Sequence, residues 1–172
     1  MGTYKEVASL SPVDAAYVAG LIDGEGTITL SRRHAADRRQ LVVSIANTEL
    51  PILEFVLRCA GAGKITRKRI SSPHHTPSFT FAITNRQALD LLRQVHPYLR
   101  SHKRERSQLA VDQYSKIVLR NGKYSPQQSE ARLAFETRFL AITARSEAEI
   151  SRLRHDKAPA TQMGTELVKS FS

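Results

Sequence analysis

The order of helical and strand-like segments constrains this chain more than any other feature of its sequence. One helical segment is followed by two strands, this order is repeated, and the chain then continues in helices. Hydrophobic periodicity and turn residues predict helices at residues 12–23, 49–60, 85–96, 102–120 and 126–142. They predict strands at residues 27–31, 40–45, 64–70 and 78–83. The predicted class is therefore α+β, with the order α-β-β-α-β-β-α and further helices after it.

Short polar residues and glycines indicate where the helices begin and end. A Ser or Thr before a helix can accept a hydrogen bond from an N–H of the first turn. The residues expected in this role are Ser11, Thr48, Thr84 and Ser125. Glycine tolerates the left-handed conformation that ends many helices. The first helix is therefore expected to stop at Gly24 and Gly26, and the second at Gly61.

Two further patterns indicate which side chains form the core. Along the last strand, Phe79, Phe81 and Ile83 share one face. The opposite face carries Ser78, Thr80 and Ala82, and it must be exposed or bind something. In the last helix, the side chains expected in the core are those of Leu133, Phe135, Phe139 and Ile142.

Positive charge is concentrated in one part of the chain. The protein carries 26 Lys and Arg against 16 Asp and Glu, a net charge of +10 at pH 7. Residues 27–106 hold 15 of the basic residues and 5 of the acidic ones, so the whole excess lies there. A partner that bears phosphates accounts for this distribution. The alternative is a basic surface without a partner.

The first helix presents small residues on one face and an acid at its end. Ala16, Gly20 and Gly24 follow one another at intervals of four residues, so a partner helix can approach closely there. Glu25 comes at the end of this face, and its carboxylate and the carbonyl of Gly24 are hard oxygen ligands. Mg²⁺ prefers such ligands. The alternative is that Glu25 is only an exposed acid where the helix stops.

The segment Val18–Gly26, VAGLIDGEG, resembles the signature of the LAGLIDADG homing endonucleases. Val18 stands in the place of the first Leu, and Gly24-Glu25 in the place of Ala-Asp. The order of helices and strands and the fragment Asn47-Thr48-Glu49 are also similar to those of the family. The resemblance covers about residues 11–120.

This resemblance implies a four-stranded antiparallel, saddle-shaped sheet that straddles duplex DNA. A single motif in the chain implies a homodimer, in which the helix face of Ala16, Gly20 and Gly24 is the interface. Glu25 and the carbonyl of Gly24 are then the metal ligands. The cofactor implied is Mg²⁺, with Mn²⁺ or Ca²⁺ able to replace it in binding. Asp23 is expected to make a helix-end contact rather than to bind metal.

Two more residues match catalytic positions of the family. Glu49 matches a position that orders water near the metal, but it also suits the first turn of the second helix. Lys103 matches the basic residue beside the scissile phosphate. That match needs one inserted residue, so His102 and Arg104 are alternatives. Leu53 stands where some relatives use an arginine.

The strand face opposite the apolar one is expected to read DNA in the major groove. Alternation selects Thr29, Ser31, Arg33, Gln40, Ser44, Lys64, Thr66, Lys68, Ser78 and Thr80. Arg67 and Arg69 are added where their strand projects beyond the core. A solvated strand face explains the Ser and Thr residues equally well.

The predicted activity is that of a site-specific DNA endonuclease. Resemblance implies Mg²⁺-dependent hydrolysis of one phosphodiester in each strand of a long pseudo-palindromic target, with short 3′ overhangs. The alternative is a DNA-binding regulator that does not cleave, or a maturase for intron RNA, on the same scaffold. A zinc site at His74, His75, His96 and Cys59 is disfavoured, because the spacing matches no common ligand pattern.

Further expectations concern domains, location and partners. Residues 1–145 are expected to form the endonuclease domain, and residues 146–172 a charged helix and a tail. The single cysteine, Cys59, fits an intracellular setting such as the cytoplasm or nucleoid of a prokaryote, or an organelle. The absence of a leader-like apolar segment argues against secretion. The expected partners are double-stranded DNA and a second copy of the chain, with no membrane and no small-molecule substrate.

Overall fold

The structure is a computed structural model that describes residues 5–32, 34–68, 76–119 and 122–144. Its order of elements confirms the predicted α-β-β-α-β-β-α pattern followed by helices. The elements are α1 (Pro12–Glu25), β1 (Gly26–Ser31), β2 (Gln40–Asn47), α2 (Leu50–Ala60), β3 (Lys64–Arg67), β4 (Phe79–Thr84), α3 (Asn85–Val95), the 3₁₀ helix η1 (His96–Tyr98), α4 (Lys103–Ile117) and α5 (Pro126–Ala141).

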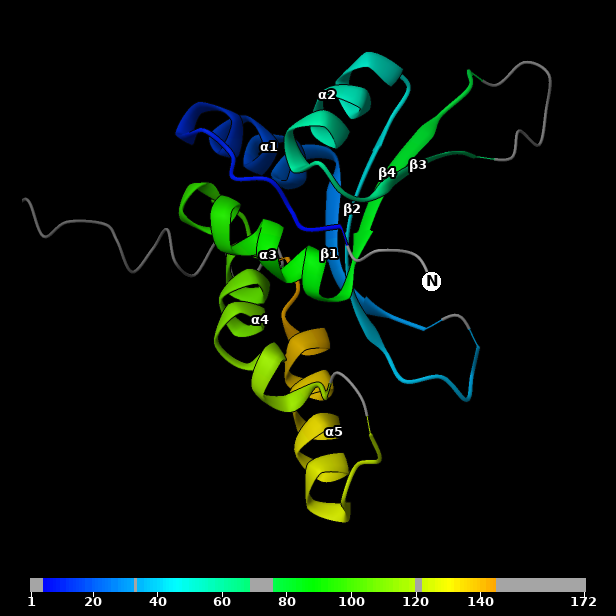
Figure 1. Cartoon of the computed structure of the whole chain (residues 1–172), viewed down its shortest axis with the longest axis vertical. Helices are drawn as coiled ribbons and strands as arrows, with labels where there is room; N and C mark the ends of the chain where they lie inside the picture. Colours follow the sequence, from blue (N-terminus) through cyan, green and yellow to red (C-terminus); the bar gives the residue numbers. More distant parts are fainter. Residues whose placement is uncertain (1–4, 33, 69–75, 120–121, 145–172) are drawn as a thin grey trace, which may run out of the picture.

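The four strands form one antiparallel sheet in the order β1-β2-β4-β3. β2 and β4 lie in the centre, and the two hairpins extend away from the helices (Figure 1). Gly26 pairs with Ile45 at one end of the β1–β2 hairpin, and Ser31 pairs with Gln40 at the other. This register fixes which residues of neighbouring strands share a face.

The core lies between one face of the sheet and the helices. Buried and less buried side chains alternate along β1, β2 and β4, as a strand covered on one face requires. The fully buried side chains on the helix-covered face of the sheet include Ile28, Leu41, Val43, Ile45 and Phe81. The predicted shared face of Phe81 and Ile83 is confirmed, with exposures of 0% and 1%. The opposite face of the sheet is left uncovered by the helices (Figure 1).

Helix α1 begins as expected and ends differently. The Ser11 hydroxyl accepts a hydrogen bond from the Asp14 N–H, which confirms it as the N-cap. The prediction that the helix stops at Gly24 in a left-handed conformation is wrong, because the helix continues through Glu25. Gly26 follows in an extended conformation with φ −100°. A Cβ there would lie 2.6 Å from the Cα of Ile22, so close packing is what requires glycine.

The caps of α2 and α3 also differ from expectation. The N-cap of α2 is Glu49 rather than Thr48, and Thr84 precedes α3 without a side-chain capping bond. Gly61 does end α2 in the left-handed conformation, with φ 64°. Asn85 begins α3 with a positive φ of 54°, a conformation that Asn adopts more readily than most residues.

The C-terminal helices are partly as predicted. Ser125 and Gln128 form a complete capping box at the start of α5. Phe135 and Phe139 are buried, but Leu133 is 65% exposed, so its predicted place in the core is wrong. The helical period of 3.6 turns Leu133 away from the face that carries the two phenylalanines. α4 and β3 are shorter than predicted within the described residues.

Two further expectations concern the C-terminal residues and the membrane. The predicted domain division after residue 145 and the helix at 146–157 lie outside the described residues. Within the described ranges, no helix combines the length and the hydropathy needed to span a membrane.

Candidate functional site

The C-terminal end of α1 presents the acid that the sequence singles out. Glu25 is the last residue of the helix and is exposed, and Gly24 before it is exposed as well. A helix end leaves its last carbonyl oxygens without intrahelical donors. The Glu25 carboxylate and the Gly24 carbonyl are therefore oxygen donors at one helix end.

Asp23 has a structural role at this helix end. Its carboxylate accepts hydrogen bonds from the Ser101 hydroxyl at 2.6 Å and from the Arg100 N–H at 2.7 Å. Partial burial by itself would raise the pKa of Asp23, but these hydrogen bonds and the charge of Lys103 hold it below its usual value. The carboxylate thus joins α1 to the turn before α4, which agrees with the expected helix-end contact.

Lys103, the first residue of α4, binds the same helix end. Its ammonium group donates to the carbonyl oxygens of Ile22 at 2.8 Å and Asp23 at 2.9 Å. Partial burial lowers the pKa of Lys103, against the opposing influence of the Asp23 and Glu25 charges. The amine is therefore held at the C-terminal end of α1 by backbone contacts, where the charge of Glu25 acts on it.

The register of β1 and β2 brings a second acid to the same end of the sheet. Gly26 pairs with Ile45, so the end of α1, which directly precedes Gly26, lies at the same end of the sheet as the end of β2. Glu49 follows β2 as the exposed N-cap of α2. Its backbone N–H donates to the side-chain oxygen of Asn47 at 2.8 Å.

Asn47 is a further polar residue at this end of the sheet, named above only as part of the fragment Asn47-Thr48-Glu49. It is the last residue of β2 and follows Ile45, the pairing partner of Gly26, by two residues along the chain. The signal that could have marked it as a site candidate is its place at the end of a strand paired with the residue after Glu25.

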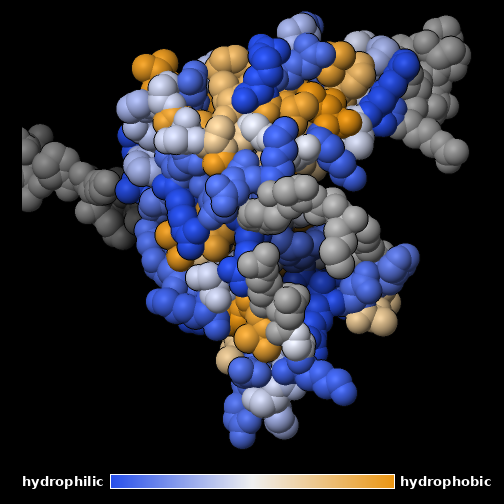
Figure 2. All heavy atoms as spheres, in the orientation of Figure 1, coloured by the Kyte–Doolittle hydropathy of each residue, from blue (hydrophilic) through white to orange (hydrophobic). Residues whose placement is uncertain are grey.

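The small residues of α1 form an exposed stripe. Ala16, Gly20 and Gly24 are all exposed, and a Cβ added at either glycine would meet no atom within 4 Å. The stripe continues into two exposed apolar side chains, Val13 at 78% and Tyr17 at 47%. Figure 2 shows hydrophobic surface among hydrophilic side chains in the region of α1 and α2. Among the described residues nothing covers this α1 face, so another helix can pack against it.

The uncovered face of the sheet carries most of the residues expected to read DNA. Cross-strand pairing places Ser31 opposite Gln40 and Thr66 opposite Thr80. By alternation and pairing, this face holds Thr29, Ser31, Gln40, Ser44, Lys64, Thr66 and Thr80. Lys68 and Ser78 extend it, since the Lys68 N–H donates to the Ser78 carbonyl at 2.8 Å.

Three of the selected residues are not placed on this face by the described structure. Arg67 pairs with Phe79 and shares the opposite face with Ile65, because successive side chains of a strand point to opposite faces. Its DNA contact, expected where β3 projects beyond the core, stays a prediction. Arg33 and Arg69 lie outside the described residues.

The described part of the chain contains no group of three or more His, Cys, Asp and Glu side chains that could hold a metal ion. A metal at Glu25 would therefore need further oxygen ligands from water, a phosphate or another chain. His74 and His75 lie outside the described residues.

Comparison with known proteins identifies the fold. No protein-family model and no curated protein sequence matches the chain. Solved structures do match. One is the homing endonuclease I-CvuI in complex with its target, with a TM-score of 0.63 and 21% identity over 85% of this chain and 94% of that one. Another is the LAGLIDADG meganuclease I-AabMI bound to uncleaved DNA, with a TM-score of 0.56 and 20% identity.

The matched structures differ in how much of their own length this chain covers. The match to I-AabMI covers 81% of this chain but only 49% of that one, so this chain spans about half of its length. The homing endonuclease I-TnaI is matched over 87% of this chain and 99% of that one, with a TM-score of 0.51 and 13% identity. The chain therefore has the LAGLIDADG homing-endonuclease fold, which confirms the resemblance seen in its motif.

Proposed function

We propose that this chain is a LAGLIDADG homing endonuclease that acts as a homodimer and makes a double-strand break in DNA. The observation that carries the proposal is the position of Glu25. This acid ends a helix whose exposed face is lined with small residues, and Lys103 is held beside it. A protein that only binds DNA does not need an acid at this position.

The homodimer follows from the α1 stripe of Ala16, Gly20 and Gly24. Two copies that pack these stripes together about a two-fold axis bring the ends of both helices, and hence both Glu25 side chains, close to each other. The site is incomplete in one chain because the described residues offer no cluster of metal ligands. The second copy supplies the other acid.

The donors at the helix end fit Mg²⁺. Glu25 offers a carboxylate and Gly24 a carbonyl, whereas Lys103 takes up the carbonyls of Ile22 and Asp23. When bound, Mg²⁺ lowers the pKa of an attacking water and neutralises charge on the scissile phosphate. The homing endonuclease I-CvuI has been crystallised with DNA in the presence of 2 mM Mg and of 2 mM Ca, which supports a site for either ion here.

The protein side chains around the metal would position the attacking water and stabilise the charge that develops on the phosphate. Lys103 places its positive charge at the helix end where charge develops on the phosphate. Glu49, or Asn47 beside it, would orient water by hydrogen bonding. The positions of Lys103 and Glu49 at the same end of the sheet as Glu25 support these roles.

DNA would lie on the uncovered face of the sheet. The polar residues there, from Thr29 to Thr80, would contact bases in the major groove, and the basic residues would neutralise phosphates. Affinity is therefore expected to fall steeply with salt concentration. A symmetric dimer implies a long pseudo-palindromic target, and the family resemblance implies short 3′ overhangs.

A second candidate is a non-cleaving regulator of DNA or a maturase for intron RNA on the same scaffold. The uncovered polar sheet face would serve either of these functions. The exposed Glu25 beside Lys103 favours the nuclease.

A cleavage screen tests the proposal. The purified protein is incubated with a plasmid library of random inserts in Mg²⁺ or in EDTA, and linearised molecules are sequenced. The expected result is linear product in Mg²⁺ alone, with a partly palindromic consensus at the ends. Retention of the library on the protein without any cut, at all divalent ion concentrations, would favour the regulator or maturase.

A further inference from the structure

A basic pocket lies at the end of β2 that is farther from Glu25. Its volume is about 490 Å³. It forms where the start of β2, the start of α3, the end of α4 and α5 come together. The residues that line it are Arg38, Arg39, Gln40, Thr84, Asn85, Arg86, Gln87, Tyr114, Val118, Leu119 and Arg132.

Positive charge dominates this pocket. Four of the lining residues are arginines and none is acidic. Glu136 lies next to the lining, where its carboxylate is 3.0 Å from Nε of Arg132 and 3.7 Å from Nε of Arg39. One acid therefore offsets only part of the charge of the four guanidinium groups, and the pocket attracts anions.

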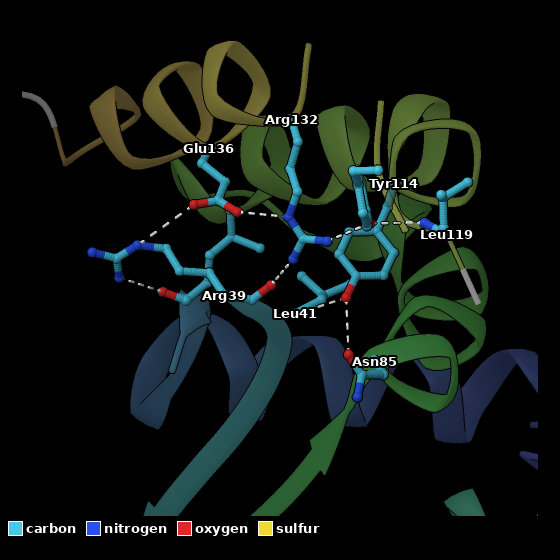
Figure 3. Close-up of polar contacts among 9 residues, drawn as sticks. Arg39, Leu41, Asn85, Tyr114, Leu119, Arg132 and Glu136 are labelled. Carbon is cyan, nitrogen blue, oxygen red and sulfur yellow. Dashed lines mark hydrogen bonds and ion pairs between the residues drawn. The ribbon is translucent and has the colours of Figure 1, made fainter. Parts of the chain in front are cut away.

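Two of the arginines hold the pocket together (Figure 3). Arg132 is only 8% exposed and donates to Glu136, to the Tyr124 hydroxyl and to the backbone carbonyl of Arg39. Arg39 donates to the Leu30 carbonyl at 3.2 Å. These contacts fasten α5 to the β1–β2 hairpin, so both side chains have structural partners already.

Tyr114 and the side-chain amide of Asn85 hold the wall of the pocket beside these arginines in place. The Tyr114 hydroxyl accepts from the Leu41 N–H and donates to the Asn85 side chain, both at 3.0 Å. The Asn85 amide in turn donates to the Gln40 side chain at 2.8 Å. The uncharged polar groups of the wall therefore satisfy one another, as Figure 3 shows for Tyr114, Leu41 and Asn85.

The other two arginines have donors to spare. Arg38 lies over the Tyr124 ring, with its guanidinium carbon 4.0 Å from the ring centroid. Arg86 is in the first turn of α3, which has no side-chain cap. Neither guanidinium group makes a hydrogen bond or an ion pair with another side chain or backbone group in residues 5–32, 34–68, 76–119 and 122–144.

We propose that this pocket binds a phosphate group through Arg38 and Arg86. Guanidinium groups match the oxygens of phosphate in geometry and charge. The uncapped first turn of α3 adds backbone N–H groups and a partial positive charge on the same side of the pocket.

Either of two molecules could supply the phosphate group: a free phosphorylated molecule or the DNA backbone. Gln40 belongs both to the uncovered sheet face and to the pocket lining. A duplex on that face would bring its backbone past the pocket at the end of β2. The DNA source rests on the proposed function, whereas binding of free phosphate does not.

The first experiment uses inorganic phosphate and the full-length chain. The double variant Arg38→Gln/Arg86→Gln is compared with Arg138→Gln, which changes an exposed arginine of α5 that does not line the pocket. Thermal unfolding is followed in phosphate and in chloride of equal ionic strength. At tenfold above Kd, phosphate is expected to raise the Tm of wild type and of Arg138→Gln by about 3 to 6 °C. The double variant is expected to lose this shift, with an unchanged circular dichroism spectrum.

The second experiment identifies the DNA source. Binding to duplex DNA is measured by anisotropy over a range of salt concentrations. If the backbone occupies the pocket, the double variant reduces the slope of log K against log salt by about 0.9 for each lost phosphate contact. A slope equal to that of Arg138→Gln, with the phosphate shift lost, assigns the pocket to a free phosphorylated molecule.

The proposal is overturned if the double variant keeps both the phosphate shift and the salt slope of the Arg138→Gln control. Neither readout depends on cleavage. If the protein binds phosphate but neither binds nor cuts DNA, the phosphate site is supported and the proposed nuclease function is refuted.

Discussion

The ammonium nitrogen of Lys103 lies 2.8 Å from the carbonyl oxygen of Ile22, in the last turn of α1. A second hydrogen bond joins it to the Asp23 carbonyl at 2.9 Å. The first residue of α4 thus closes the helix end that presents Glu25. The positive charge next to the candidate catalytic acid also stabilises the fold.

Replacement of Lys103 is therefore expected to lower stability as well as activity. Lys103→Met leaves two carbonyls without a charged donor, and the free energy of unfolding should fall by about 1 to 2 kcal/mol. Urea denaturation measures this loss. The control is Lys116→Met, an exposed lysine at the other end of α4, for which about 0.5 kcal/mol or less is expected. Equal losses in the two variants would contradict a structural part for Lys103.

Glu25→Gln is expected to separate binding from cleavage. The exposed side chain makes no packing contact that the fold depends on, so DNA affinity should stay within about threefold. Loss of the metal ligand should reduce the cleavage rate by at least about a hundredfold. Single-turnover cleavage and anisotropy measure the two effects. Glu54→Gln, at an exposed acid on α2, has the same change of charge and should cut normally. Undiminished cutting by Glu25→Gln would remove Glu25 from the mechanism.

Gly20→Leu is expected to break the homodimer and leave the protomer folded. A Cβ at Gly20 meets no atom within 4 Å in the chain itself, and leucine favours the helix over glycine by up to about 1 kcal/mol. Sedimentation should show the wild type at about twice the chain mass of 19.2 kDa and the variant at the chain mass. Ala134→Leu adds similar apolar surface at an exposed position of α5 and should remain dimeric. A dimeric Gly20→Leu would place the interface elsewhere.

Tyr114→Phe is expected to have an effect that depends on pH. The variant leaves the Leu41 N–H without its acceptor in a buried place, at a cost of about 1 to 2 kcal/mol at pH 8. Burial raises the pKa of Tyr114 above its usual 10.0. The phenol therefore stabilises the wild type fully below pH 10, and this contribution is lost as pH rises further. Urea denaturation at pH 8 and at pH 10.5 should show the difference between wild type and variant shrinking. A constant difference would mean that Tyr114 does not titrate in this range.

The local pattern of the sequence was sufficient for the order of elements and for the core of the sheet. Alternation of apolar residues along β4 predicted the buried face of Phe81 and Ile83, because a strand has a fixed period of two residues. The same period puts Arg67 on the face of Ile65, and its expected DNA contact stays a prediction. The prediction failed for Leu133, since apolar character alone does not tell which side of a helix meets the core.

The capping residues show where local chemistry is not enough. Ser11 and Ser125 cap their helices as predicted, since their partners lie three residues away in the chain. Thr48 is not the N-cap of α2, whereas Thr84 occupies the N-cap position of α3 but makes no side-chain capping bond. Gly26 was expected to end α1 through its left-handed freedom, but packing against Ile22 is the reason that it must be glycine.

The sequence by itself determined the element order, the exposed acid at the end of α1, the small-residue face and the excess of positive charge, because all of these depend on neighbours along the chain. Only the tertiary structure decided that Lys103 binds the end of α1, that Asp23 holds the turn before α4, and that four arginines from distant segments line one pocket. Contacts of this kind join residues up to 93 positions apart. They depend on the packing of the helices against the sheet, which no local period of the sequence encodes.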